Sequence, residues 1–366
     1  MIGPLPLDTP ELEGRISPAL DAVETRLLEV VNNADETINP PTSHLAQAGG
    51  KRLRPVLTLL TAQLGDPALA TGEQVRDAGV AVELTHIATL YHDDVMDDAP
   101  LRRGAPSAQT VWGNSAAILT GDVLVARASQ LVAALGPQAV LAHAKTFERL
   151  CMGQLHETLP RPAGTDPVEH YIDVLADKTG SLIAVSARYG VMLTGGGAET
   201  ERIVEEFGEK IGVAFQLADD VIDLTSDSAT TGKTPGTDLR EGVDTMPVLL
   251  LRQALAAGEL DAAGQSILSA LSTGDLADDA VLADVVDRLR VHPVLERTRA
   301  MATQWAQEAV DLLAGLEAAV VAGTRERLAD AEPDVVEAAV SDARERVVLV
   351  REGMEEFARV LVDRAA

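Results

Sequence analysis

Two short acidic segments constrain this chain more than any other feature of its sequence. Residues 93–97 read Asp-Asp-Val-Met-Asp and residues 219–223 read Asp-Asp-Val-Ile-Asp, so the segments differ in one side chain. On an α-helix the first and last residues of such a segment lie about 40° apart around the axis, so its carboxylates can share one broad face. A face this crowded repels itself unless a cation binds there. Mg²⁺ takes oxygen ligands, typically one or two carboxylates together with waters and substrate phosphates.

The residues before each segment argue against a solvated surface. Residues 85–92 and residues 211–218 are largely apolar, and each run leads directly into its aspartates. Carboxylates at the end of an apolar helix are partly buried, and buried charge must be paired or bound to metal. A solvated face would explain one such segment in an acidic protein, but two favour a pair of facing surfaces that hold a diphosphate through Mg²⁺. The expected metal-site residues are Asp93, Asp94, Asp97, Asp219, Asp220 and Asp223.

Clustered basic residues stand out, because the chain has 57 acidic and 30 basic residues and a formal net charge of −27. Nonspecific attraction to nucleic acid or anionic lipid is therefore not expected. Residues 49–55 read Gly-Gly-Lys-Arg-Leu-Arg-Pro, where the glycines let backbone N–H groups approach an anion and Lys51 and Arg54 project to one side. Arg102 and Arg103 follow the first acidic segment and suit bidentate phosphate contacts. A solvated turn is the alternative for residues 49–55, but we favour a phosphate site.

Three further features are candidates for the same site. His86 lies seven residues before Asp93 and on roughly the same helix face, so we favour anion contact over an ordinary core histidine. Residues 178–181 read Lys-Thr-Gly-Ser and interrupt an apolar helix, which could expose carbonyl groups and a lysine to a cavity or be a simple kink. Residues 226–242 are polar and predict a lid loop that contains Lys233.

The composition favours an all-α fold, a single large helical bundle. Aromatic residues make up 2% of the chain while alanine, leucine and valine are abundant, which favours helices over strands. No linker divides the chain, so we expect one domain over residues 1–366 with a charged helical excursion near residues 318–352. The one cysteine, Cys151, predicts an intracellular, cytoplasmic protein. No secretory signal is visible and no apolar run reaches the ~18 residues of a membrane span, so stable membrane insertion is not expected.

Taken in order, these motifs resemble those of the trans-isoprenyl diphosphate synthases, the polyprenyl synthetase family. The likeness covers residues of about 45–305 and the final helix, and it rests on GGKRLRP, ELTHIATLYHDDVMDDAPLRRG, GQLHE, KTG and FQLADDVIDLTSDSATTGKTPGTDLREG. It implies a central cavity between antiparallel helices and usually a homodimer. It also implies two substrates, an allylic diphosphate and isopentenyl diphosphate, and a prenyltransferase reaction between them.

The resemblance implies a role for each candidate residue. Mg²⁺ at the aspartates would hold the allylic diphosphate, which Arg102, Lys178 and Lys233 would also contact. Isopentenyl diphosphate would be bound by Lys51, Arg54, His86 and Arg103. Departure of pyrophosphate would leave an allylic cation, stabilised by oxygen atoms at Lys178, Thr179 and Gln216, and isopentenyl diphosphate would attack it.

Product length can be argued from the helix before Asp93. Members that make short products carry bulky aromatic residues four to five positions upstream, about 6–7.5 Å along the axis, whereas this chain has Ala88 and Thr89 there. We expect a long all-trans product (C30–C50), plausibly for a quinone side chain. A C15–C20 product is the alternative if Leu119 or Val123 closes the tunnel.

Two other classes of protein are weighed against this prediction. A terpene cyclase shares the first acidic segment, but its second motif is typically of another type. A noncatalytic subunit of a heteromeric synthase would have degraded motifs, and both are intact here. One departure from the family pattern is Val243, which follows Glu241 and Gly242 where the family usually has lysine, and Gln154 and Glu157 are given secondary roles at most.

Overall fold

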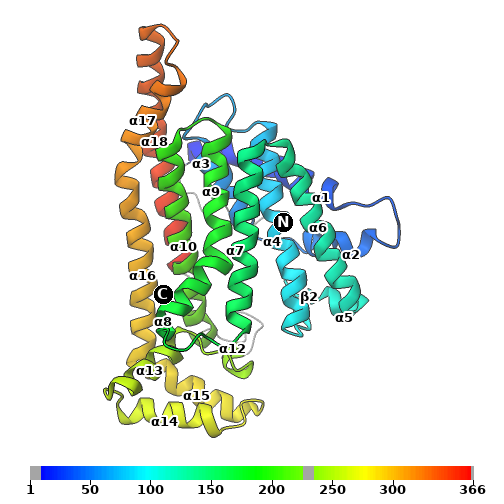
Figure 1. Ribbon diagram of the computed structural model, residues 1–366, viewed down its shortest axis with the longest axis vertical. Coiled ribbons are helices and arrows are strands. Elements are labelled where there is room, and N and C mark those ends of the chain that lie inside the picture. Colours follow the sequence, from blue (N-terminus) through cyan, green and yellow to red (C-terminus); the bar gives the residue numbers. More distant parts are fainter. Residues whose placement is uncertain (1–9, 226–234, 364–366) are drawn as a thin grey trace. The chain divides into compact units, whose positions relative to one another are not determined.

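The computed structural model describes residues 10–225 and 235–363, and within these ranges the chain is almost entirely helical (Figure 1). Besides the helices and the loops that connect them, β1 (Leu101–Arg102) and β2 (Ala105–Pro106) pair as a short antiparallel hairpin. The all-α prediction is confirmed. The helices are α1 (Pro10–Val31), α2 (Asn39–Gln47), α3 (Leu53–Ala62), α4 (Glu73–Met96), α5 (Ala108–Trp112), α6 (Asn114–Ala134), α7 (Pro137–Thr158), α8 (Pro167–Leu175), η1 (Ala176–Gly180), α9 (Ser181–Leu193), α10 (Ala198–Thr225), α12 (Thr237–Arg240), α13 (Met246–Ala257), α14 (Ala262–Thr273), α15 (Asp279–Val291), α16 (Pro293–Leu312), η2 (Leu313–Gly315), α17 (Leu316–Arg327) and α18 (Pro333–Val362).

The chain divides into two compact units. The first consists of Met1–Glu148, Leu182–Gly208 and Leu312–Phe357. The second consists of Arg149–Ser181, Glu209–Asp311 and Ala358–Ala366. The first acidic segment and the Gly-Gly-Lys-Arg motif belong to the first unit, and the second acidic segment belongs to the second.

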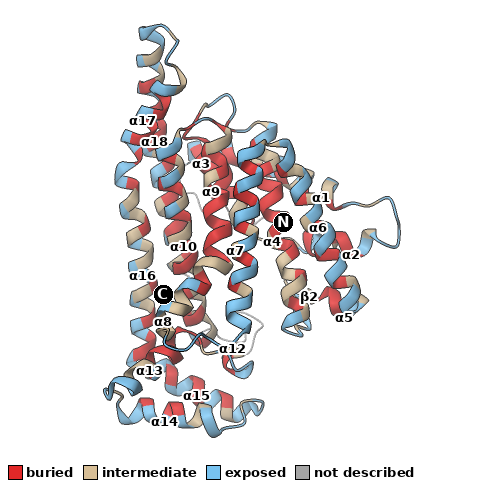
Figure 2. Cartoon of the chain, viewed as in Figure 1, coloured by how far each residue is buried: buried red, intermediate tan, exposed pale blue. Residues whose placement is uncertain are grey.

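Helix α4 forms the centre of the first unit. It packs against α1, α3 and α6, and Figure 2 shows buried residues along α3 and α4. The helix α1 supplies one apolar face at spacings of three and four residues, as expected for an amphipathic helix. The buried residues of that face are Leu12, Ile16, Leu20, Val23, Leu27 and Val31.

The second unit has its own apolar core, to which the C-terminal half of α10 contributes Val213, Leu217 and Val221. Residues of α13, α14, α15 and α16 complete it. Local capping fixes where its helices begin. The carboxylate of Asp166 accepts hydrogen bonds from the first turn of α8, and Asp278 does the same for α15, as N-cap aspartates commonly do.

The charged excursion consists of two antiparallel helices, α17 and α18. Ion pairs join Arg325 to Glu337 at 3.2 Å and Glu317 to Arg344 at 3.4 Å. Their inner face is anchored in the first unit, because Arg346 is 5% exposed and donates to the carbonyl groups of Gln63 and Gly65, at 3.2 and 3.4 Å. The excursion was expected to end near residue 352, before the final helix, whereas α18 runs unbroken from Pro333 to Val362.

By length and composition, α6 is apolar enough to cross a membrane, although 39% of its most apolar 18-residue stretch is buried in the protein. The expectation that no apolar run is long enough was wrong for this helix, because it considered only uninterrupted runs and α6 contains Asp122 and Arg127. One face of α6 packs on α4 through residues such as Gly121 and Leu124. A helix that packs on a core in this way can have the same length and composition as a membrane span, so these two properties do not identify one.

Candidate functional site

The first acidic segment occupies the last turn of α4 and the residue that follows it. Asp93 is half-buried and Asp97, at the C-cap, is exposed, whereas Asp94 is fully buried. Arg102 Nε donates a hydrogen bond of 2.6 Å to Asp94 Oδ1, while Asp94 Oδ2 is buried without a hydrogen-bond partner among the described residues. Burial raises the pKa of Asp94 and Arg102 opposes this shift. The middle aspartate therefore faces inward and fixes Arg102, and the outer two lie nearer the surface.

The second acidic segment repeats this layout near the C-terminal end of α10. Asp219 and Asp223 are half-buried, whereas Asp220 is 5% exposed. Tyr171 Oη donates to both Asp220 oxygens, at 3.0 and 3.1 Å, and the Met246 amide donates to Oδ2 at 3.1 Å. Burial raises the pKa of Asp220 well above its usual value.

Both segments offer carboxylate oxygens of the kind that a hard divalent cation takes. In each, the first and last aspartates lie nearer the surface than the middle one, which is anchored in its own unit. Over residues 10–225 and 235–363, no group of three acidic, histidine or cysteine side chains is already gathered as a metal site. These donor types fit Mg²⁺, with substrate phosphates and waters supplying the remaining ligands.

The basic residues of the first unit gather around the turn before α3. Lys51 is exposed, and burial lowers the pKa of Arg54 to about 10, with Arg103 also lowering it and Glu83 raising it. Burial lowers the pKa of His86 well below its usual value, and the charges of Arg54 and Arg103 add to the shift, so its imidazole is neutral at pH 7. The structure thus brings Arg54, His86 and Arg103 close together.

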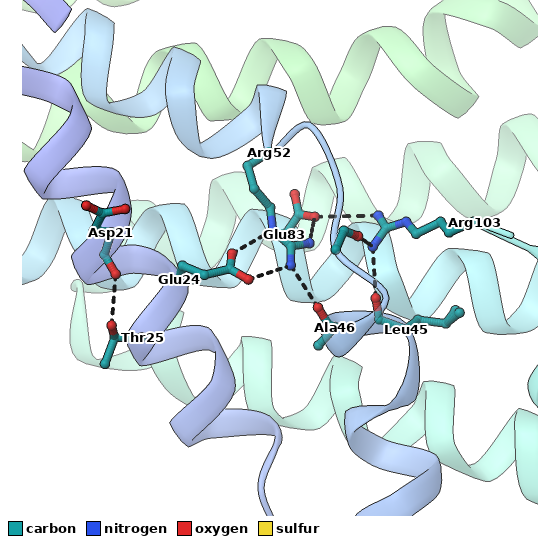
Figure 3. A network of polar contacts seen from close by, with 9 residues as sticks. Asp21, Glu24, Thr25, Leu45, Ala46, Arg52, Glu83 and Arg103 are labelled. Atoms are coloured by element: carbon teal, nitrogen blue, oxygen red, sulfur yellow. Dashed lines mark hydrogen bonds and ion pairs between the residues drawn. The ribbon is translucent and has the colours of Figure 1, made fainter. Parts of the chain in front are cut away.

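Two residues of this region were not identified as site residues from the sequence. Arg52 is buried, donating to Glu24 and Glu83 rather than pointing to solvent with its neighbour Lys51 (Figure 3). Glu83 is buried on α4 three residues before His86. A lone glutamate within an apolar run was the available signal, because a buried carboxylate requires a partner.

The interruption predicted at residues 178–181 is present as η1, a π-helix between α8 and α9. Thr179 is buried, and Lys178 Nζ lies 2.5 Å from Glu157 Oε2. Arg149 braces this segment through ion pairs to Asp177 at 2.7 Å and Glu209 at 2.5 Å. Single-turn π-helices are frequent at functional sites, which favours the functional interpretation over a simple kink.

The close packing of η1 against α10 depends on glycine. A Cβ atom on Gly212 would lie 2.4 Å from Gly180 Cα, so Gly212→Ala should lower the free energy of unfolding by about 1–3 kcal/mol. The matched control is Gly14→Ala on α1, where a Cβ meets nothing within 4 Å and we expect a neutral or stabilising effect of up to about 1 kcal/mol. Denaturant unfolding of both variants measures the difference, and an equal effect at the two positions would contradict this packing.

The other predicted residues are placed as follows. Gln216 is half-buried on α10, upstream of the second acidic segment. Lys233 and the lid residues 226–234 lie outside the described residues. Val243, which replaces the family's lysine, is 37% exposed, and its amide donates to the Asp238 carbonyl at 2.9 Å.

The helix face upstream of Asp93 is lined by small residues. Ala81 and Ala88 are fully buried and Thr89 is half-buried. On α6, Leu119 is 63% exposed and Val123 is 36% exposed, so these side chains lie on the outer face of the helix.

Several known proteins resemble this chain in sequence or in structure. Residues 35–280 match the polyprenyl synthetase family. The chain is 45% identical over 287 residues to nonaprenyl diphosphate synthase of Mycobacterium tuberculosis, covering 78% of this chain and 83% of that protein. It is 36% identical over 302 residues to heptaprenyl diphosphate synthase component 2 of Geobacillus stearothermophilus, covering 82% and 91%. A crystal structure of geranylgeranyl pyrophosphate synthase from Corynebacterium glutamicum, complexed with calcium and isoprenyl diphosphate, superimposes with a TM-score of 0.73 at 37% identity, covering 94% and 99%.

Proposed function

Because this chain belongs to the polyprenyl synthetase family, we propose that it condenses isopentenyl diphosphate head to tail with an allylic diphosphate in a Mg²⁺-dependent reaction. The observation that carries the proposal is the presence in one chain of two acidic segments with the same layout and a separate cluster of cations. Reaction between two diphosphates needs two anion sites of different character. Carboxylates suit a metal-bound diphosphate, and arginines suit one bound directly.

Asp93, Asp97 and Asp219 are the proposed metal ligands, with Asp223 nearby and with Asp94 and Asp220 holding the surrounding structure. Mg²⁺, when bound, would stabilise charge on the departing pyrophosphate. Arg102, fixed by Asp94, and Lys178 add positive charge to the same group. Lys233 is assigned this role from the sequence alone.

The cationic cluster would bind isopentenyl diphosphate. Arg54 and Arg103 offer planar guanidinium groups, and the His86 ring offers an N–H donor. Arg54 Nε is buried and has no hydrogen-bond partner among the described residues. Lys51, exposed beside the turn, would complete the site.

The η1 segment would stabilise the allylic cation. Oxygen atoms at Lys178, Thr179 and Gln216 can face positive charge without reacting as strong nucleophiles. Isopentenyl diphosphate would attack this cation through its double bond, and loss of a proton, with pyrophosphate as the acceptor, would restore an allylic product. No side-chain nucleophile is required.

A long product, C30–C50, is the proposed outcome. Small buried residues at Ala81 and Ala88 and the similarity to a nonaprenyl diphosphate synthase support it, and the intact acidic segments favour a catalytic chain over a noncatalytic subunit. The test is an assay with labelled isopentenyl diphosphate and C5, C10, C15 or C20 primers, followed by chromatography. Mg²⁺-dependent growth to C30 or longer is expected. An end product of C15 would overturn the proposed length, and no incorporation would overturn the activity.

A homodimer in the cytoplasm is the proposed assembly and location. The exposed face of α6 includes the apolar residues Ile118, Leu119 and Val123, and exposed apolar residues close together commonly mark contacts between proteins. Leu119→Glu should convert the dimer to a monomer in light scattering, because it places a charge in the interface. Leu69→Glu, at a residue that is 46% exposed outside this face, is the control. A wild-type monomer, or a Leu119→Glu protein that stays dimeric, would contradict the assignment.

A further inference from the structure

A buried carboxylate, Glu83, lies among the arginines assigned to isopentenyl diphosphate. Its side chain is 2% exposed on α4. Glu83 Oε1 accepts a hydrogen bond of 2.7 Å from Arg52 Nη1 and lies 3.7 Å from Arg103 Nη2 (Figure 3). Its charge also acts on Arg54, whose pKa it raises against the larger effect of burial. The carboxylate of Glu83 therefore interacts with three guanidinium groups, those of Arg52, Arg54 and Arg103.

Arg52 is an internal support and not a substrate ligand. It donates four hydrogen bonds, two to Glu24 at 2.7 and 2.9 Å, one to Glu83 and one of 2.9 Å to the Ala46 carbonyl. Its side chain is 1% exposed, and its backbone is left-handed with φ of 51° at the N-cap of α3. This conformation turns Arg52 inward, while Lys51 beside it is exposed.

Arg103 crosses the glycine turn next to this support. Its Nη1 donates to the Leu45 carbonyl at 2.9 Å and to the Gly49 carbonyl. A Cβ on Gly50 would lie 3.2 Å from Arg103 Cζ, so the guanidinium lies directly over the turn. Glu83 is the acidic residue that pairs with Arg103 among the contacts of the described residues.

We propose that Glu83 is a positioning residue for isopentenyl diphosphate, because it holds Arg103 over the turn of residues 49–51 against repulsion from Arg52 and Arg54. The inference rests on the proposed function for the identity of the diphosphate. Like charges in a low-dielectric site repel strongly, and loss of one partner leaves the others uncompensated. The positioning role predicts that loss of the Glu83 charge weakens binding of the diphosphate. Charge alone predicts the opposite, since removing an anion from a phosphate site should strengthen that binding. The direction of the change therefore separates positioning from simple electrostatics.

The experiment compares Glu83→Gln with Glu24→Gln. Both variants weaken the support of Arg52, but only Glu83 also pairs with Arg103. Isothermal titration with isopentenyl diphosphate, without metal or allylic substrate, should show Kd raised by about 10-fold in Glu83→Gln and by less than about threefold in Glu24→Gln. In the assay, KM for isopentenyl diphosphate should rise in Glu83→Gln while KM for the allylic substrate stays constant. Glu83→Asp keeps the charge and serves as a second variant, with an intermediate Kd expected if Glu83→Gln does not fold.

Three results would overturn the inference. These are equal weakening in both glutamine variants, unchanged or tighter binding in Glu83→Gln, and a wild-type protein that does not bind isopentenyl diphosphate. If only Glu83→Asp folds, a wild-type Kd in that variant is the overturning result. A wild-type protein that binds isopentenyl diphosphate but forms no product would contradict the proposed function alone, because the calorimetric comparison does not depend on turnover.

Discussion

Replacing Asp93 or Asp219 by asparagine should lower kcat by about 10³-fold or more, equivalent to about 4 kcal/mol of transition-state stabilisation. Each substitution removes one anionic ligand from the proposed metal site while it keeps the shape of the side chain. The charge that develops on the departing pyrophosphate would then lack its counterion. Both residues are half-buried at the ends of their helices, so the fold should persist. Initial rates at saturating Mg²⁺ and circular dichroism measure the two quantities.

Asp98→Asn is the matched control for these variants. Asp98 is exposed and directly follows the segment, with a left-handed backbone at φ of 49° that asparagine tolerates. We expect its kcat to stay within about threefold of wild type, because Asp98 is exposed and is not one of the proposed metal ligands. Equal losses in Asp93→Asn and Asp98→Asn would indicate a general effect of surface charge and would contradict the metal assignment.

Thr89→Phe should shorten the main product from C30–C50 to C15–C20. Thr89 lies four residues before Asp93, about 6 Å along the helix, and it is half-buried, so a ring there obstructs a growing chain without filling a closed core. The wild-type hydroxyl donates to the His86 carbonyl within the same helix, and its loss costs little. Chromatography of products made from labelled isopentenyl diphosphate reports the change.

Thr303→Phe is the control for product length. Its hydroxyl makes the same kind of contact, to the Arg299 carbonyl, but the residue is exposed on α16. Its product distribution should match that of wild type. A Thr89→Phe enzyme that still makes C30–C50 chains would show that the hydrocarbon does not run along this face of α4.

Local pattern was sufficient to predict the helices and the clusters that they carry. The apolar runs before each acidic segment predicted helices that end near the aspartates, and α4 and α10 do so. Helix α4 ends at Met96, and Asp98 just beyond it has a left-handed backbone. The spacing of residues along one helix predicts that the helix forms and which residues share a face. The residue at which α4 ends depends also on the β1–β2 hairpin that follows.

Contacts distant in sequence could not be predicted in the same way. Nothing in the sequence of the two acidic segments distinguishes Asp94 and Asp220 from the aspartates beside them. Their inward orientation depends on partner residues that lie elsewhere in the chain. Arg102 comes from the β1–β2 hairpin, and Tyr171 lies 49 residues before Asp220. The ion pairs of Arg52 with Glu24 and Glu83 likewise connect three parts of the chain. These are α1, α4 and the turn that precedes α3 (Figure 3).

The most direct test of the account is a crystal structure grown with Mg²⁺ and an unreactive allylic thiolodiphosphate. The account predicts Mg²⁺ ions about 2.0–2.1 Å from carboxylate oxygens of Asp93, Asp97 and Asp219, with the diphosphate of the analogue bound to the same ions. An analogue bound elsewhere, or Mg²⁺ ions without ligands from both acidic segments, would contradict it.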